Sequence, residues 1–359
     1  MSKPPIRLLV VDDSAYNRRN IADVFAEYPE VEVVGKAADG EEALRLATLL
    51  KPDVITLDLE MPRMDGFTFL RILMSRQPTP VIVVSSYSQK ENVFKALELG
   101  ALDFVAKPSA QIPEGAQDRR DQILEKVLLV RQLRPMREAP PSRRSLVPYA
   151  PDSRSSYPDS TSVRAAAPYV APKHLVAIAS STGGPTALLE IFGKVTRIGH
   201  LGIVVAQHMP DKFTRTFADR LDRRGVVRTS EAQEGDRIAR LTGFVCPGRQ
   251  CMEVIQAGSE LRLTVSAPRP EDRYVPSADR LLKSVAKAAG SRAVGIILTG
   301  MGDDGVEGAR AIRDAGGLVV AESQETAVVF GMPGAAVRAG IPQKILPLPQ
   351  IADLVAQLG

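Results

Sequence analysis

Residues 174–195, HLVAIASSTGGPTALLEIFGKV, predict a strand, a tight turn and a helix in immediate succession. The apolar run stops at two serines and a threonine, and two glycines then permit a sharp change of chain direction. Pro185 falls in the first turn of the helix, where the N–H that proline lacks would have no partner. This unit indicates an α/β fold and places hydroxyl groups at the end of a buried strand.

The same alternation of strand and helix fills most of the chain. Runs rich in valine and isoleucine alternate with amphipathic helical segments in residues 1–125 and again in residues 173–359. Such runs are typical of parallel sheets that are covered by helices on both faces. We therefore predict two doubly wound α/β domains over these ranges. Within the second domain, residues 234–266 indicate shorter strands and hairpins.

The two predicted domains are joined by a segment of different composition, which we take as a linker over residues 126–172. Residues 131–173 carry many arginines among Pro, Ser and Ala, and they show no helical or strand period. Because this segment has little apolar surface to bury, it cannot offset the entropy cost of ordering the chain. We therefore expect a disordered linker. The linker accounts for much of the net charge of +4. We interpret this charge as solvation and expect no nucleic-acid partner.

The overall composition limits the environment of the protein. The chain of 359 residues has only two cysteines, which makes a disulfide framework implausible and favours a cytoplasmic location. None of its apolar runs is long enough to span a bilayer, so we expect no membrane insertion.

In the first domain, polar residues follow the predicted strands at one edge of the sheet: Asp12 and Asp13, Asp58, Ser85 and Lys107. Three carboxylates at one edge repel each other unless a cation lies among them, and Mg²⁺ prefers such oxygen ligands. A lysine and a hydroxyl nearby would bind phosphoryl oxygens, which makes Asp58 a candidate nucleophile for phosphoryl transfer. The alternative is that each residue only caps its own strand or loop.

In the second domain, Ser181 follows a strand and has Gly183 two positions later, as a nucleophile elbow requires. Ala179 replaces the first glycine of that motif, so the turn fits equally well as a phosphate-binding loop at a helix N-terminus. Both interpretations remain open from the residues alone.

A nucleophilic serine needs a base and an acidic partner for that base. Of the three histidines, only His208 follows a predicted strand and so reaches the same sheet edge as Ser181. Asp303 and Asp304 follow a third strand, and their spacing does not choose between them. One of them could instead cap the helix that begins near Val306.

Two sets of motifs resemble known families. "VVDDS", "DLEMPRMDG", "VVSS" and "AKP" resemble the receiver domain of bacterial response regulators, and "SSTGGP", "QHMPDKFTRTFADRL", "ILTGMGDDG" and "VVFGMP" resemble the methylesterase domain of the chemotaxis protein-glutamate methylesterase (CheB) family. The resemblance implies a flavodoxin-like receiver followed by a Rossmann-like α/β esterase domain.

The resemblance also implies roles for individual residues in the receiver. Asp58 would be the phospho-acceptor, Asp12 and Asp13 would hold Mg²⁺ with it, and Ser85 and Lys107 would bind the phosphoryl group. Phe104 stands where receivers often carry an aromatic switch residue.

In the second domain the resemblance assigns Ser181 as nucleophile, His208 as base and Asp304, rather than Asp303, as the acid that orients it. Thr182 and Met301 would be neighbours of the site, and the ester step would need no cofactor. Cys251 departs from the family, because a histidine is expected at its position.

The implied function is a phosphorylation-activated hydrolase that removes methyl esters from, and deamidates glutamines of, methyl-accepting chemotaxis receptors. A histidine kinase of the same pathway would supply the phosphoryl group. Two other hypotheses are a response regulator with a DNA-binding output and an adaptor that has lost esterase activity. The second domain has no helix-turn-helix-like pair, and its set of Ser, His and Asp argues against the adaptor.

Overall fold

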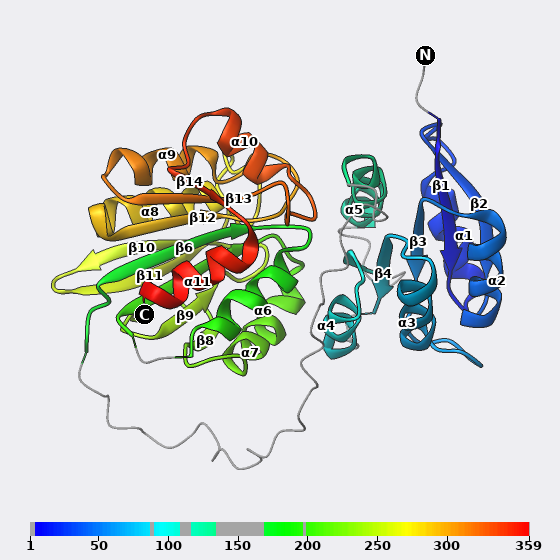
Figure 1. The fold of residues 1–359 in the computed structure, drawn as a ribbon, viewed down its shortest axis with the longest axis horizontal. Helices are drawn as coiled ribbons and strands as arrows, with labels where there is room; N and C mark the ends of the chain where they lie inside the picture. The colour runs from blue at the N-terminus through cyan, green and yellow to red at the C-terminus, as the bar shows by residue number, and fades with distance from the viewer. Residues whose placement is uncertain (1–3, 87–89, 108–115, 134–168, 197–198, 359) are drawn as a thin grey trace, which may run out of the picture.

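The computed structural model describes residues 4–86, 90–107, 116–133, 169–196 and 199–358. We call residues 4–133 the N-terminal part and residues 169–358 the C-terminal part. Figure 1 shows the two parts side by side, each with its own sheet.

The strands alternate with helices along most of the chain, as the sequence predicts. The strands are β1 (Ile6–Val11), β2 (Val31–Ala37), β3 (Val54–Leu57), β4 (Val81–Ser85), β5 (Asp103–Ala106), β6 (His174–Ser180), β7 (Leu201–Gln207), β8 (Arg228–Glu231), β9 (Thr242–Val245), β10 (Cys251–Ala257), β11 (Glu260–Ser266), β12 (Ala293–Ile297), β13 (Leu318–Glu322) and β14 (Lys344–Leu346). The helices are α1 (Ala15–Val24), α2 (Gly40–Leu50), α3 (Gly66–Arg76), α4 (Lys90–Glu98), α5 (Ala116–Leu128), α6 (Gly184–Lys194), α7 (Thr214–Asp222), α8 (Ala278–Ala289), α9 (Val306–Asp314), α10 (Met332–Arg338) and α11 (Leu348–Leu358).

The predicted parallel α/β sheets are confirmed in both parts. Within the described residues, the N-terminal strands pair in the order β2-β1-β3-β4-β5, and every pairing is parallel. This is the flavodoxin-like order. The main C-terminal sheet has the order β14-β13-β12-β6-β7-β9-β8 and is also parallel.

Successive residues of each strand face opposite sides, so each sheet has two apolar cores. In β1, Leu9 and Val11 pack with α2, α3 and α4, whereas Leu8 and Val10 pack with α1 and α5. The C-terminal sheet is covered by α6, α7 and α11 on one face and by α8, α9 and α10 on the other. Helices on both faces explain why the strands read as continuous apolar runs.

The predicted region of short strands splits into two structures. β9 joins the main sheet in parallel, while β10 and β11 form an antiparallel hairpin that turns at Gly258. The hairpin packs its Met252, Val254 and Leu263 against the α8 face of the sheet. The hairpin is therefore a small second sheet whose apolar side extends this core.

The N-terminal end of the predicted linker needs a correction. Residues 126–132, assigned to the linker from composition, are helical, and they complete α5 and a following 3-10 turn (Leu129–Gln132). Val127 and Leu129 are buried, and Val127 packs with the strands of the N-terminal sheet. Their apolar surface offsets the cost of ordering this segment. Residues 134–168 lie outside the described residues.

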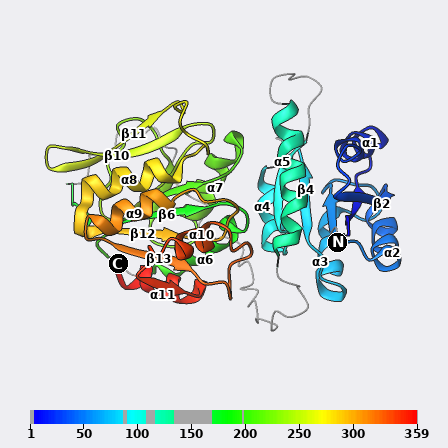
Figure 2. The same cartoon turned by 90° about the horizontal axis from the view of Figure 1, so that it is seen from above.

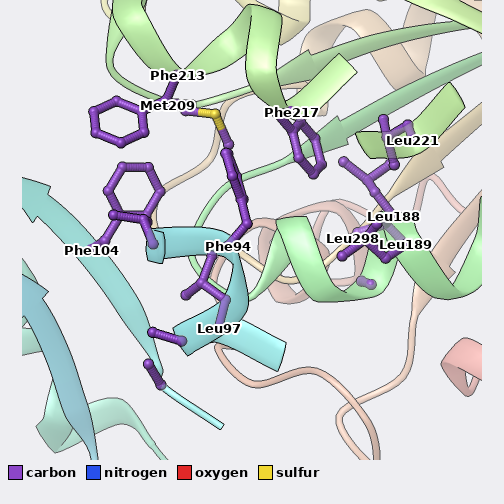
Figure 3. Close-up of a cluster of buried hydrophobic side chains, with 14 of the residues drawn as sticks. Phe94, Leu97, Phe104, Leu188, Leu189, Met209, Phe213, Phe217, Leu221 and Leu298 are labelled. Carbon is purple, nitrogen blue, oxygen red and sulfur yellow. The ribbon is translucent and has the colours of Figure 1, made fainter. Parts of the chain in front are cut away.

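The two parts meet where α4 of the N-terminal part contacts α6 and α7 of the C-terminal part, as Figures 1 and 2 show. Phe94 of α4 stacks on Phe217 of α7, with ring centroids 5.4 Å apart. Phe104 of β5 lies 4.7 Å from Phe213, and Figure 3 shows these rings in one buried cluster. The apolar core is therefore continuous between the two parts.

Among the described residues, no helix is both long and apolar enough to cross a membrane.

Candidate active sites

The first candidate site lies at the carboxyl edge of the N-terminal sheet. Asp58 follows β3, and Asp12 and Asp13 follow β1. One ligand oxygen from each of these three carboxylates can lie within 4.8 Å of the others. Such a hard oxygen donor set fits a magnesium ion. The structure thus brings together the residues that the strand-end argument selected.

Lys107 closes this acidic cluster. Its Nζ lies 2.5 Å from Asp58 Oδ2 and 3.0 Å from Asp12 Oδ2. Burial disfavours the charged form of Lys107, but its bonds to the two carboxylates outweigh this and raise its pKa. Burial raises the pKa of Asp58 despite the nearby ammonium group. Lys107 therefore stays charged and faces the atom that would receive a phosphoryl group.

Ser85 is the last residue of β4 and is buried beside this site. It pairs with Ala106 in the β4–β5 register, and its carbonyl accepts the N–H of Lys107 at 2.8 Å. β4 and β5 are thus tied together at the point where both would contact a phosphoryl group.

The second candidate site lies where the connections from the C-terminal sheet diverge. β7 and β12 flank β6 on opposite sides, so the ends of β6 and β12 form a topological switch point, the usual place for a ligand in such sheets. Ser181 follows β6, and its N–H donates to the carbonyl of Thr299 beyond β12, at 3.0 Å.

Two glycines make the turn at Ser181 possible. Gly183 has φ +80°, a left-handed conformation that favours glycine, and it precedes α6. At Gly300 a Cβ would lie 2.8 Å from Ser181 Cβ, so only glycine allows this close approach. The turn is therefore set both by local sequence and by a distant glycine.

Gln207 joins the ends of β6 and β7, and sequence reasoning missed it. Its Nε2 donates to the carbonyls of Ser181 and His208, at 2.9 and 3.0 Å. Its Oε1 accepts the hydroxyl of Ser180 at 2.7 Å. The two serines of the motif are thus distinct, since Ser180 is buried against Gln207 and Ser181 is only half-buried.

His208 contacts Asp304 and not Asp303. Its Nε2 lies 2.8 Å from Asp304 Oδ2, which leaves Nδ1 as the nitrogen that can accept a proton. The Asp304 side chain is 2% exposed and the Asp303 side chain 53%. In the described part of the chain, no hydrogen bond joins Ser181 Oγ to His208.

A helix N-terminus fixes Asp304. Its Oδ2 accepts the N–H of Ala278 at 2.8 Å, and its Oδ1 accepts the N–H of Asp279 at 3.0 Å. These are the first N–H groups of α8, which have no acceptor within the helix. Neither Asp303 nor Asp304 caps α9, whose N-cap is Gly305, so that alternative for the pair is wrong.

Thr182 and Met301 lie next to Ser181 and on the facing loop. Their backbone N–H groups donate to no acceptor among the described residues. If Ser181 acts as a nucleophile, these N–H groups are the donors that an oxyanion would need. The loop of Met301 is held because Gly331 and Met332 both donate to the carbonyl of Gly300.

Glu322 stabilises the turn at Ser181 through Thr299, and no sequence signal indicated this role. Its Oε2 accepts the N–H of Thr299 at 2.8 Å, and its Oε1 accepts the hydroxyl of Thr326 at 2.9 Å. Burial raises the pKa of Glu322 to about 7. Because Thr299 in turn binds Ser181 and Thr182, this carboxyl group acts on the serine turn through one residue.

The N-terminal part reaches directly into this site. The hydroxyl of Thr182 donates to Asp103 Oδ2 at 2.5 Å, and the same oxygen pairs with Lys126. Thr182 is 4% exposed in this arrangement. Asp103 was not predicted, since its partner lies 79 positions along the chain.

Cys251 lies outside the site. It begins β10, is fully buried, and its Sγ lies 3.7 Å from Asp272 Oδ2. Burial raises the pKa of its thiol, which therefore stays neutral and fills space.

Comparisons with known proteins match both parts of the chain. The family model for the CheB methylesterase matches residues 176–355, and the model for the response regulator receiver domain matches residues 8–113. The chain is 46% identical to protein-glutamate methylesterase/protein-glutamine glutaminase 1 of Myxococcus xanthus, over 99% of this chain and 98% of the relative. It is 46% identical to protein-glutamate methylesterase/protein-glutamine glutaminase 3 of Geobacter sulfurreducens, over 98% of this chain and 97% of that one.

A solved structure matches the C-terminal part. The catalytic domain of the Thermotoga maritima CheB methylesterase is 33% identical, with a TM-score of 0.50, and covers 52% of this chain and 98% of its own. The chain therefore belongs to the CheB family of protein-glutamate methylesterases/protein-glutamine glutaminases, with a receiver domain ahead of the methylesterase domain.

Proposed function

We propose that this chain hydrolyses γ-glutamyl methyl esters of methyl-accepting chemotaxis receptors, and deamidates glutamines, under control of phosphorylation at Asp58. The observation that carries the proposal is the convergence of Ser181, the His208–Asp304 pair and two N–H groups without an acceptor in the described ranges at one switch point. The family membership supplies the substrate class. The free, buried cysteines are compatible with a cytoplasmic location, where the receptors present their methylated segments.

The mechanism follows from the positions of these groups. Ser181 Oγ attacks the γ-carbonyl carbon while His208 takes its proton through Nδ1. Asp304, bound to Nε2, holds the ring and stabilises the imidazolium that forms. The N–H groups of Thr182 and Met301 bind the developing oxyanion. His208 returns the proton to the leaving oxygen, and methanol departs.

Hydrolysis of the acyl-enzyme completes the cycle, with His208 again acting first as base and then as acid. His208 takes a proton from water, the hydroxide attacks the acyl-serine carbonyl, and Ser181 leaves with the proton that His208 returns. The product is a free glutamate carboxylate. Deamidation uses the same acyl-enzyme, with ammonia as the first leaving group.

In the receiver, Asp58 Oδ would attack the phosphorus of a phosphohistidine on a chemosensory histidine kinase. Asp12, Asp13 and Asp58 would hold Mg²⁺, which neutralises charge on the transferring oxygens. Lys107 and Ser85 would then bind the new phosphoryl oxygens, so that Lys107 exchanges a carboxylate partner for a more highly charged one.

β5 offers a direct route from the phosphorylation site to the esterase site. Lys107 follows this strand, Phe104 within it packs on Phe213, and Asp103 at its start binds Thr182. Any shift of β5 that accompanies phosphorylation would change both contacts. A population shift that releases Thr182 would open the site to the receptor.

The test measures methanol release from membranes that carry methylated receptors, with and without a small phosphodonor and Mg²⁺. For the wild type we expect the donor to raise the rate ~10-fold, a coupling of ordinary size. Asp58→Asn should keep the basal rate but lose the response. A wild-type rate of zero with Asp58 demonstrably phosphorylated would contradict the proposed activity, and activation that persists in Asp58→Asn would contradict the proposed control.

A charge reversal at the interface should raise the basal rate without phosphodonor. Glu98 pairs with Arg220 at 2.8 Å and with Arg224 at 2.6 Å, and its side chain is 32% exposed. In Glu98→Arg these two attractions become repulsions, so we expect the basal rate to rise ~5-fold. Glu41→Arg is the matched control, because Glu41 is exposed on α2. An unchanged basal rate in Glu98→Arg would show that this contact does not restrain the enzyme.

A further inference from the structure

Tyr274 lies against the face of the His208 ring. The two ring centroids are 5.4 Å apart and the planes differ by only 9°, an offset parallel stack. Tyr274 belongs to the connection between β11 and α8. This connection is part of none of the family motifs, and the proposed mechanism gives it no role. Asp304 contacts the same imidazole at its edge, through Nε2.

The phenol itself is held in a defined position. Its hydroxyl donates to Asp303 Oδ1 at 3.0 Å, while Arg273 Nη1 lies 3.4 Å from Asp303 Oδ2. Burial and Asp303 together raise the pKa of Tyr274, so the hydroxyl remains a donor. At Gly302, with φ +86°, a Cβ would lie 2.6 Å from the Tyr274 oxygen. Glycine thus makes room for the phenol.

The connection that carries Tyr274 is anchored at both ends. On one side Asp272 Oδ2 accepts the N–H of Arg269 at 2.7 Å and pairs with the buried Arg280 at 2.8 Å. On the other side the chain enters α8, whose first N–H groups bind Asp304. The segment is therefore fixed to the same carboxylate that fixes the edge of His208.

We propose that Tyr274 is a positioning residue for the ester hydrolysis: its ring fixes the plane of His208, and Asp303 is its tether. The two adjacent aspartates then divide one task, since Asp304 holds the edge of the imidazole and Asp303 holds the residue that covers its face. The inference rests on the proposed function in that His208 is taken as the base.

The stack has two consequences for the reaction. It limits rotation of the imidazole, so that Nδ1, the nitrogen not bound by Asp304, keeps one direction while it takes the proton of Ser181. It also places an aromatic face beside a ring that becomes a cation in the transition state, an attraction that is absent in the ground state. A contribution made only in the transition state appears in kcat and leaves KM unchanged.

The kinetic test compares Tyr274→Leu, Tyr274→Phe and wild type in methanol release by the full chain with phosphodonor. We expect Tyr274→Leu to lower kcat ~10-fold with KM within about twofold. Tyr274→Phe keeps the ring and loses the tether, so its kcat should stay within about threefold of wild type. Tyr169→Leu is the matched control, since Tyr169 contacts Arg237 and Leu261 instead, and its kcat should not change.

A second measurement detects the stack without relying on activity. The chain has only three histidines, so selective labelling gives three imidazole signals in NMR spectra, assigned with His208→Gln. The ring current of the stacked Tyr274 shifts the His208 resonance. Tyr274→Leu should therefore change the chemical shift of His208, while the chemical shifts of His174 and His200 stay the same.

Several results would overturn the inference: a His208 signal that does not move, a kcat unchanged in Tyr274→Leu, a loss confined to KM, or equal losses for Phe and Leu. Failure of the proposed function would give a different result, because neither wild type nor Ser181→Ala would then release methanol. The NMR comparison would still decide whether Tyr274 holds the His208 ring.

Discussion

Replacing Ser181 with alanine should reduce methanol release from methylated receptors by at least ~10⁴-fold, in both the presence and the absence of phosphodonor. The hydroxyl of Ser181 is the proposed attacking group. Ser180 Oγ is held by Gln207, and Thr182 contributes its backbone N–H to the proposed mechanism. Removing one half-buried hydroxyl should leave the fold intact, so phosphorylation of Asp58 should proceed as in wild type.

Ser180→Ala is the matched control for this variant. Ser180 is the preceding residue and is fully buried, so the loss of its bond to Gln207 should cost about 1 kcal/mol of stability. Its methanol release should stay within about tenfold of wild type. If Ser180→Ala is silent and Ser181→Ala is active, the nucleophile has been assigned to the wrong serine.

Asp304→Asn should lower kcat by about 10³- to 10⁴-fold with little change in KM. All three hydrogen bonds of Asp304 come from donors: His208 Nε2, and the N–H groups of Ala278 and Asp279. An amide has one acceptor oxygen, so its NH₂ must face at least one donor. If it faces His208, the ring protonates on Nδ1 and cannot take the proton of Ser181. If it faces Asp279, a bond at the helix N-terminus is lost.

The neighbouring Asp303→Asn variant is the control, because it makes the same chemical change one residue away. Asp303 is largely exposed, and asparagine still offers an oxygen to the Tyr274 hydroxyl. Its kcat should fall less than tenfold. The measurement is the steady-state kcat of both variants, after each has been shown to keep the melting temperature of wild type. Equal losses would mean that the two aspartates are not distinct in function.

The elements that could be predicted from sequence are those that depend on short-range pattern. Apolar runs such as residues 174–180 alternate with helical segments, and this alternation predicts parallel sheets. Parallel strands present their carboxyl ends at one edge, so Asp58 and Lys107 could be placed together before any contact was known. Likewise His208 was the one histidine that follows a strand.

The C-terminal end of α5 escaped prediction for a physical reason. Residues 126–132 look like part of a polar segment by composition, because Arg131 and Gln132 lie next to the basic linker. Their helix forms because Val127 and Leu129 are buried by other parts of the chain. The composition of a segment does not show which residues distant in sequence will bury it.

The sequence by itself determined the two α/β sheets, the strand ends that carry reactive side chains and, through its motifs, the family. The motifs also favoured Asp304 over Asp303, and the structure supplies the contact of Asp304 with His208. Only the tertiary structure decided that Tyr274 stacks on the same ring and that Asp103 binds Thr182. Periodicity is a local property, repeated every few residues, and can be read from the chain. These contacts join residues 66 to 96 positions apart, and they exist because packed elements bring the residues together.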